Sequence, residues 1–405
     1  MRILKIFSAL STFFLSVTLY SQHNTSSPYS MFGLGEPETK FYGQNSGMAS
    51  AGIGLYEYGF LNSANPASMA IDSLSVIFDV SAAMRISSFA GSDQINRATN
   101  TNLKKISLGL RVFSKLNVNA GLLPYSNVQY KIKTTGYTEG ESTEYDILHE
   151  GNGGMSRIFV SGSYKILPEL MLGARASYIF GDINISENAF SSYGSTTTMT
   201  GNKLFFDFGL MYVKKLNENN EFSVGAVYGY KTDVTLSRQR FISIGNVTET
   251  MTPQVEYIPF FAGGGLALKN ISGRRYNTFA VDYKFTGRAN LPKPSAVGVY
   301  YANAHRINGG LKIVPNYRTP RNYFQRAGYQ LGGYYELSGL KINGNIMKEY
   351  GVTIGSEFPL KKMSNFFISI DLGQRSGKNL IRENFVMFTI GASLNESWFV
   401  KWVYE

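Results

Sequence analysis

The chain has no cysteine in 405 residues, and it has only three histidines. The absence of cysteine excludes disulfides and thiolate metal sites. The histidines, His23, His149 and His305, are far apart in the sequence, so a histidine-based metal or catalytic site would need distant loops to meet. The one local cluster, His149 with Asp146 and Glu150, is more typical of an exposed acidic loop. We therefore expect neither an enzyme nor a cofactor.

Long apolar runs are also missing, except near the start. Arg2 and Lys5 precede an apolar stretch from Ile6 to Tyr20, and the small residue Ser21 follows. This pattern predicts a signal peptide over 1–21, with cleavage before Gln22. No later run reaches the 18 apolar residues that a membrane helix needs. If the exported chain crosses a bilayer, we expect it to do so as a closed β-barrel, whose backbone groups are all paired.

Strict alternation of apolar residues fills the region between Leu74 and Leu394. In the last segment Phe388 and Ile390 share one face of a strand, while Met387 and Thr389 share the other, because side chains on a strand alternate sides. We expect the apolar stripe to face lipid and the opposite face to point into water. The pattern predicts an all-β protein, a transmembrane antiparallel β-barrel.

Turn residues divide this region into about fourteen strands. The predicted strands are 74–87, 103–113, 116–133, 155–166, 170–185, 200–214, 221–236, 256–269, 276–286, 302–314, 322–335, 350–359, 365–375 and 384–395. Their connections alternate between short turns and long polar loops, as in outer-membrane barrels. The predicted long loops are 134–154, 186–199, 237–255 and 336–349. Four prolines leave the strand boundaries open in 286–322.

The predicted organisation has four parts. A signal peptide covers 1–21, an N-terminal extension and hatch 22–73, the barrel 74–395, and an aromatic tail 396–405. In the tail, Trp398 and Trp402 lie on one face, which is typical of the membrane interface.

The net charge of +11 falls to +9 without the signal peptide, which leaves 37 basic residues against 28 acidic ones. The basic residues are dispersed and no recognition helix is present, so we expect no nucleic acid partner. Outer-membrane lipid and lipopolysaccharide are the simpler partners for this charge.

Small residues and a tripeptide motif precede the first predicted strand. Gly47, Gly52 and Gly54 belong to a stretch rich in Gly and Ala, and Asn65-Pro66-Ala67 follows it. This arrangement resembles the FadL/TodX family of outer-membrane transporters for hydrophobic compounds. The resemblance implies a fourteen-stranded barrel with an N-terminal hatch, in which Gly47, Gly52, Gly54, Asn65, Pro66 and Ala67 would take part. A segment that fills the lumen without moving is the alternative.

The third predicted strand contains Pro124, which lacks the N–H that a sheet ladder needs. We therefore expect a bulge or kink there. The resemblance implies a lateral opening in the barrel wall at this kink, bordered by Gly121, Pro124 and Tyr125. A bulge that only accommodates the hatch is the alternative.

Several charged residues fall on the predicted inner face, among them Asp79, Arg157, Arg175, Asp207, Asp282 and Asp371. We expect most to form ion pairs between neighbouring strands. A ligand with a carboxylate would need a cation, and Arg85 and Arg111 on the first strands are the candidates.

The sequence thus predicts a monomeric barrel in the outer membrane of a Gram-negative bacterium, acting as a passive diffusion channel for hydrophobic small molecules such as long-chain fatty acids. Two alternatives stay open. One is a barrel similar to PorV that acts as a protein partner in the type IX secretion system. The other is a structural or surface-interaction barrel.

Overall fold

The computed structural model describes residues 27–38, 40, 43–71, 75–90, 95–137, 144–189, 193–292, 298–360 and 364–397. The predicted signal peptide and the tail with Trp398 and Trp402 lie outside the described residues. No helix in the described part of the chain is long and apolar enough to cross a membrane.

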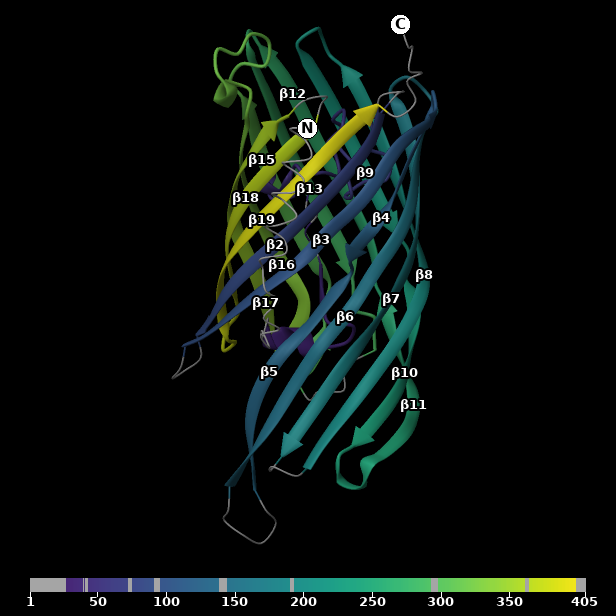
Figure 1. Cartoon of the computed structure of the whole chain (residues 1–405), viewed down its shortest axis with the longest axis vertical. Coiled ribbons are helices and arrows are strands. Elements are labelled where there is room, and N and C mark those ends of the chain that lie inside the picture. Colours follow the sequence, from purple (N-terminus) through teal and green to yellow (C-terminus); the bar gives the residue numbers. More distant parts are fainter. Residues whose placement is uncertain are drawn as a thin grey trace, which may run out of the picture.

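Antiparallel strands close into a barrel of fourteen strands, which confirms the predicted fold class (Figure 1). Three of the fourteen are interrupted, so that each of these consists of two labelled pieces. The strands are β2 (Ser75–Ala90), β3 (Ile95–Phe113), β4 (Leu116–Pro124) with β5 (Ser126–Tyr137), β6 (Glu144–Lys165), β7 (Leu170–Ala189), β8 (Tyr193–Lys215), β9 (Asn220–Gly229) with β10 (Thr232–Ile242), β11 (Val247–Ile258) with β12 (Phe260–Ser272), β13 (Arg275–Gly287), β15 (Ala304–Val314), β16 (Gly328–Ile342), β17 (Asn345–Pro359), β18 (Asn365–Ser376) and β19 (Arg382–Ser397). The last strand pairs with the first, from Arg382 opposite Ala90 to Ser397 opposite Ser75.

Short elements complete the described chain. They are η1 (Pro28–Met31), β1 (Glu36–Pro37), η2 (Ser46–Met48), η3 (Ile244–Asn246), β14 (Val299–Tyr301) and η4 (Tyr323–Gln325).

The outer surface of the barrel is apolar, as the alternation predicts. Ile390 is 51% exposed and Phe388 40%, whereas their neighbour Met387 is buried. Exposed apolar side chains of this kind require lipid around them. The expectation that Thr389 points into water is wrong, because its side chain is only 4% exposed and packs inside a filled barrel.

The two ends of the barrel differ. At one end, which we call the turn end, β6 and β7 are joined across 166–169 and β8 and β9 across 216–219. At the other, the hairpin end, the pairs β5/β6, β7/β8 and β10/β11 project well beyond the rest of the wall (Figure 1). All four predicted long loops, 134–154, 186–199, 237–255 and 336–349, are mostly strand in their described residues.

The reason for this error lies in the side chains of the projecting hairpins. On β7, Ile183 is buried while Asn184 is not, and on β8 Met199 is buried while Thr200 is exposed. Apolar residues thus point inward and polar residues outward, as in a soluble sheet. Strands predicted from apolar residues on the outer face therefore end where the two faces exchange polarity, although the strands themselves continue.

An inner segment, residues 43–71, lies inside the barrel and is almost entirely buried. It hydrogen-bonds to strands on opposite sides of the wall, including Leu210 of β8, Asp282 of β13 and Thr353 of β17. The barrel therefore has no open central pore at the level of this segment.

Replacing Ile390 by Arg near the middle of β19 should destabilise the folded barrel by about 2–4 kcal/mol, because the charge would enter the lipid midplane. The control is Ser237→Arg, an exposed outward position on the projecting β10, which should cost far less. Urea unfolding in lipid vesicles, followed by loss of the folded band in unheated detergent gels, would measure both. Equal costs would place Ser237 in lipid and contradict the assignment of the projecting hairpins.

Candidate functional site

Glycines on the inner face of the wall contact the backbone of the inner segment. A Cβ atom at Gly310 would lie 2.6 Å from Cα of Met48, and one at Gly332 would lie 2.6 Å from N of Ala49. The same close approach occurs on seven strands, at Gly173, Gly209, Gly225, Gly265, Gly310, Gly332 and Gly355. We call these residues the glycine girdle. Any side chain at these positions would displace the inner segment.

The predicted hatch residues lie where the inner segment meets this girdle. Gly47 packs on Gly355, Gly54 on Gly265, and Pro66 and Ala67 on Gly173. Gly52 contacts Ala64 within the segment, where a Cβ would lie 3.0 Å from that of Ala64.

Two polar side chains fix the inner segment. Asp282 of β13 accepts hydrogen bonds from three consecutive N–H groups, those of Gly52 (2.6 Å), Ile53 (2.9 Å) and Gly54 (3.3 Å). Asn65 donates to the carbonyl groups of Ile53 (2.9 Å) and Leu210 (3.1 Å) and accepts from Ala67 N–H. The buried carboxylate and the buried backbone groups thus satisfy one another.

The third strand divides next to Pro124. Pairing between β3 and β4 ends at Ile106 opposite Leu122, and beyond that point β5 pairs with β6 but not with β3. The edge of β3 over 95–105 therefore faces a lateral gap in the wall. Pro124 and Tyr125 lie where the wall loses its pairing with β3, and Gly121 packs against Ile106 on the turn-end side of the gap.

A short piece of the N-terminal chain occupies this gap. Residues 36–38, which we call the strap, pair with β5 so that Glu36 lies opposite Asn127 and Pro37 opposite Ser126. Glu38 N–H donates to the carbonyl group of Tyr125 (2.9 Å), and its carboxylate accepts from Lys104 of β3 (2.8 Å). The strap thus bridges the two edges that the wall leaves unpaired.

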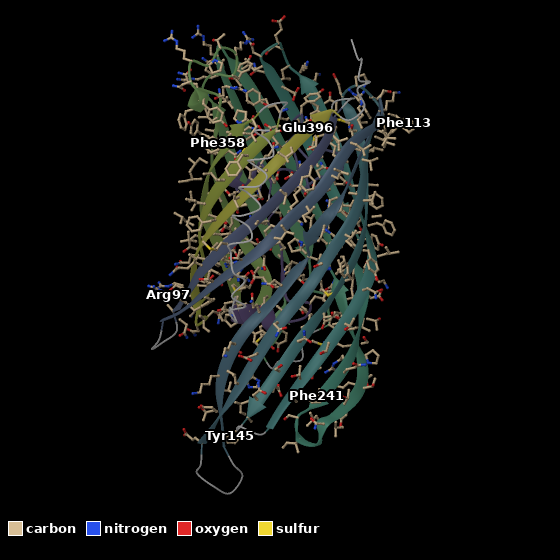
Figure 2. All side chains as sticks on the ribbon, in the orientation of Figure 1. Arg97, Phe113, Tyr145, Phe241, Phe358 and Glu396 are labelled. Carbon is tan, nitrogen blue, oxygen red and sulfur yellow. The ribbon has the colours of Figure 1, made fainter. Side chains whose placement is uncertain are left out.

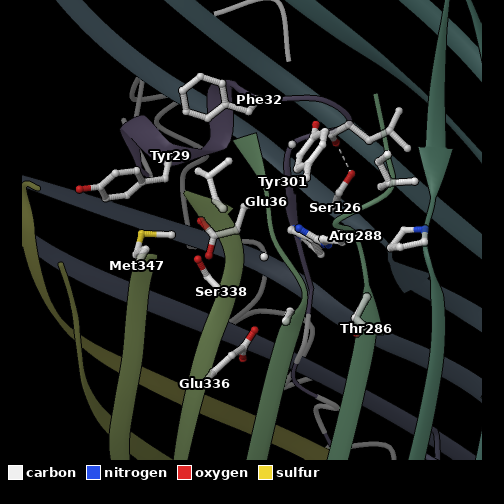
Figure 3. A pocket seen from close by; sticks show the side chains of 18 of the residues that line it. Tyr29, Phe32, Glu36, Ser126, Thr286, Arg288, Tyr301, Glu336, Ser338 and Met347 are labelled. Atoms are coloured by element: carbon white, nitrogen blue, oxygen red, sulfur yellow. Dashed lines mark hydrogen bonds between the residues drawn. The ribbon is translucent and has the colours of Figure 1, made fainter. Parts of the chain in front are cut away.

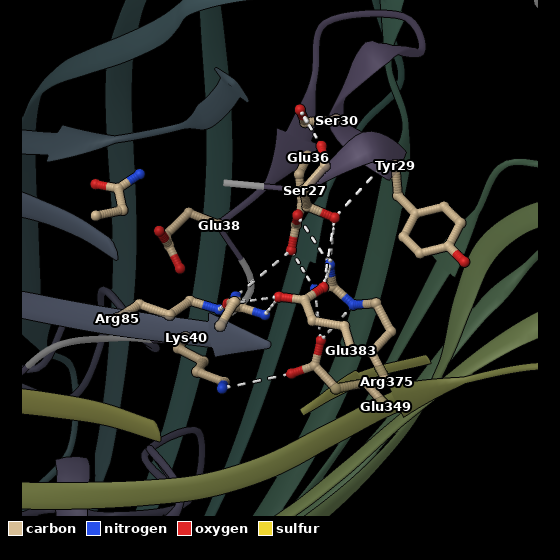
Figure 4. Close-up of polar contacts among 12 residues, drawn as sticks. Ser27, Tyr29, Ser30, Glu36, Glu38, Lys40, Arg85, Glu349, Arg375 and Glu383 are labelled. Carbon is tan, nitrogen blue, oxygen red and sulfur yellow. Dashed lines mark hydrogen bonds and ion pairs between the residues drawn. The ribbon is translucent and has the colours of Figure 1, made fainter. Parts of the chain in front are cut away.

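A buried cluster of ion pairs holds the strap from inside (Figure 4). Arg375 contacts Glu36, Glu349 (2.6 Å) and Glu383 (3.3 Å), and Arg85 contacts Glu383 (2.7 Å). Although burial by itself would raise the pKa of Glu36, the nearby guanidinium groups of Arg375 and Arg85 hold that pKa below its usual value. The pairing therefore stabilises the folded state at neutral pH and is lost as the pH falls and Glu36 is protonated.

Arg85 and Arg111 do not form a common site. Arg85 is engaged by Glu383, whereas the Arg111 guanidinium donates to the carbonyl groups of Phe113 and Ser114 (2.7 Å) at the turn end. Of the other charges on the predicted inner face, Arg175 with Asp207 and Asp79 with Lys105 form pairs between neighbouring strands. Asp371 instead pairs with Lys40 of the N-terminal chain, and Asp282 binds backbone N–H groups of the inner segment.

Three cavities meet at the strap. The largest, of about 120 Å³, lies between η1 and the wall (Figure 3). Aromatic rings line it together with two arginines and four glutamates, namely Arg288, Arg375, Glu36, Glu256, Glu336 and Glu349. The second, of about 90 Å³, is lined mostly by apolar residues, including Pro124, Phe205 and Phe261. The third, of about 50 Å³, lies beside the strap and is lined by residues of β2, β3, β5 and β19. Pro37 lines all three, so the strap borders each of these cavities.

Two cations of the second cavity lack acidic partners. Arg157 of β6 and Arg288 after β13 form no ion pair with any described residue, and the Nε atom of each is buried without a hydrogen bond there. Lys284, over the ring of Phe261 at 4.3 Å, adds a third positive charge to the lining. The cavity therefore combines apolar walls with positive charge, which suits an anionic group on an apolar body.

Glu36, Arg288 and Arg375 are not identifiable from local sequence patterns. Glu36 and Arg375 are partners from opposite ends of the chain, and Arg288 follows β13 without a motif around it. His149, Asp146 and Glu150 all lie on β6 but have different partners. Asp146 pairs with Lys133 and Glu150 with Lys131, whereas His149 contacts Thr134 (2.9 Å) and Glu187 (3.6 Å).

Comparison with known proteins gives a family and a fold. A model of the BamG family matches residues 3–405. No curated protein matches the sequence. The structure is similar to the toluene transporter TbuX of Ralstonia pickettii, with a TM-score of 0.61, 12% identity and coverage of 87% of this chain and 98% of that one. It is also similar to a Pseudomonas aeruginosa FadL homologue, with a TM-score of 0.58, 12% identity and coverage of 89% of this chain and 99% of that one. For the P. putida toluene transporter TodX the TM-score is 0.57, the identity 13% and the coverage 89% of this chain and 99% of that one.

Two adjacent glycines of β12 test the girdle. A Cβ at Gly265 would meet Ile53 Cβ at 3.0 Å and lie closer still to Asp282 and Gly54, whereas one at Gly264 would meet nothing nearer than 3.8 Å. Gly265→Val should therefore destabilise the barrel by about 1–3 kcal/mol through overpacking, and Gly264→Val should not. The temperature at which the folded gel band disappears would measure both, and limited proteolysis would detect a displaced inner segment. Equal temperatures for the two variants would contradict the girdle.

Proposed function

We propose that this chain, which belongs to the BamG family, is an outer-membrane channel that takes up hydrophobic molecules with an anionic head, such as long-chain fatty acids, and releases them sideways into the membrane. The observation that carries the proposal is the break at Tyr125, which separates β5 from β3 and leaves a gap in the wall beside two interior cavities. The similar structures named as toluene transporters and as a FadL homologue support a hydrophobic cargo.

The path begins at the hairpin end, which we assign to the outside. There the inner faces of the projecting strands carry an apolar cluster that includes Tyr130, Ile183 and Leu236. The cluster continues to Phe205 and Ile258, which also line the second cavity. A hydrophobic molecule could thus leave water before it reaches the gap, and each CH₂ group kept out of water contributes about 0.8 kcal/mol.

The strap is the proposed gate. Displacing it would join the second and third cavities and open them to the lateral gap that the strap occupies, because Pro37 and Glu38 line both cavities. Only two residue pairs with β5 and a few ion pairs hold it, so its opening is far less costly than opening the wall itself. The inner segment, fixed by the girdle and by Asp282, closes the direct route to the turn end in this proposal.

A disulfide can lock this gate cleanly, because the chain has no cysteine of its own. Pro37→Cys combined with Ser126→Cys joins two residues that face each other across the β1–β5 pair. Under oxidising conditions the locked variant should lose oleate uptake, and dithiothreitol should restore it. Uptake would be measured in a host that lacks its own long-chain fatty acid channel.

The matched control is Asn184→Cys with Thr198→Cys, an equivalent cross-strand pair in the continuous β7–β8 ladder. This disulfide should leave uptake unchanged. Full uptake through the oxidised strap variant, with the disulfide verified by mass spectrometry, would exclude the strap as the gate.

The head-group site is tested separately. Replacing Arg157 or Arg288 by Gln should weaken oleate binding about 10- to 100-fold, since a hydrogen bond to a charged group contributes roughly 1.5–3 kcal/mol. Binding of an uncharged alkane should not change, because it needs only the apolar walls. Equilibrium binding to the purified barrel in detergent would measure both ligands, with exposed Arg382→Gln as the control. Equal loss for oleate and alkane would contradict a head-group role for the two arginines.

A second candidate function is that of a protein partner, as for a PorV-like component of a secretion system. It is favoured by β11, which pairs only with β10 and leaves its other edge without a partner among the described strands. Such an edge can accept an added strand from another protein. The test is whether one specific protein is recovered with the purified barrel and is lost when Thr250 on this edge is replaced by Pro. That result would support this function instead of transport.

A further inference from the structure

Two neighbouring connections at the turn end carry five arginines and no acidic residue. Arg274 and Arg275 lie at the turn between β12 and β13, and Arg318, Arg321 and Arg326 lie in the connection 315–327 between β15 and β16. All five side chains are exposed, and none forms an ion pair with a described residue. We call these two connections together the arginine rim.

The rim is an ordered structure. Asn316 accepts a hydrogen bond from Thr319 N–H (3.0 Å), and Asn322 accepts one from Gln325 N–H (3.0 Å), where η4 begins. Tyr317 N–H donates to the carbonyl group of Arg274 (3.0 Å), so the two connections are joined. The arginines are therefore presented together by one local fold.

Aromatic residues connect the rim to the outer surface of the barrel. Tyr323 of η4 stacks on Phe358 of β17, with ring centres 6.3 Å apart and an angle of 5°, and Phe358 lies 6.4 Å from Phe366 of β18. Phe358 shares its face of β17 with the exposed Ile354, and Figure 2 places it on the outside near the turn end. Phe324, beside Tyr323, is 65% exposed.

We propose that the arginine rim binds the phosphate groups of anionic phospholipids in the leaflet that surrounds the turn end. Aromatic residues gather at the boundary between hydrocarbon and head groups, where the hydroxyl group of a Tyr such as Tyr323 can face the head groups. The stack of Tyr323, Phe358 and Phe366 sets this boundary at the rim, so the adjacent arginines lie at the level of the phosphates. A guanidinium group binds phosphate through two parallel hydrogen bonds, which an ammonium group does not.

A protein partner is less well matched to this surface. The rim is continuous with the apolar, lipid-facing wall, so lipid already occupies one side of it. Five unpaired arginines near one another repel, and head-group phosphates relieve that repulsion without any further component.

The test is native mass spectrometry of the full-length protein, released from nanodiscs that contain equal amounts of phosphatidylglycerol and phosphatidylcholine. The wild-type protein should retain phosphatidylglycerol preferentially. The triple variant Arg318→Gln, Arg321→Gln, Arg326→Gln should lose that preference, by about five-fold for each arginine removed. The control triple variant Arg97→Gln, Lys378→Gln, Arg382→Gln makes the same change in net charge at the hairpin end and should behave as wild type.

Heat-dependent migration in detergent gels would verify that both triple variants fold, and the single variant Arg321→Gln provides a milder test in the same assay. Undiminished phosphatidylglycerol retention in the folded rim variants would overturn the proposal. An equal loss in the control triple variant would also overturn it, because net charge rather than the rim would then hold the lipid.

Discussion

The fold is built around close contact between the backbone of the barrel wall and the backbone of the inner segment. At the glycine girdle the wall and the inner segment approach until no side chain fits between them. That proximity brings the N–H groups of Gly52, Ile53 and Gly54 within reach of Asp282, and the carbonyl groups of Ile53 and Leu210 within reach of Asn65. In a dry interior these groups would be costly if left unpaired. Wall and segment therefore satisfy each other, and neither has the same structure without the other.

The strap follows a different rule. Besides a short backbone pairing with β5, it is held mainly by charge, through Glu36 with Arg375 and Glu38 with Lys104. The charged groups of the strap can exchange their partners for others. The backbone of the inner segment, packed directly against the wall, cannot shift by small steps. The N-terminal chain thus divides into a part that the glycine girdle fixes in the lumen and a part that ion pairs and two backbone pairs hold in the wall. The division lies beside the break between β4 and β5, where we propose the side exit.

Alternation of residues was enough to predict fourteen antiparallel strands, because lipid outside and a filled interior impose a period of two along every strand. The same rule failed on the projecting hairpins. There Thr200 faces water and Met199 faces the interior, so the polarity is inverted while the strand continues. The candidate site was harder to predict. Pro124 indicated a break from its chemistry alone, but Arg375 and Glu36 are 339 positions apart, and only the closed barrel brings them together.

The inner segment also constrains the order of assembly. It precedes β2 in the chain and ends up enclosed by a wall that closes only when β19 pairs with β2, from Arg382 to Ser397. Because the girdle leaves no room between the wall and the segment, we expect the strands to assemble around an inner segment that is already in place when β19 pairs with β2.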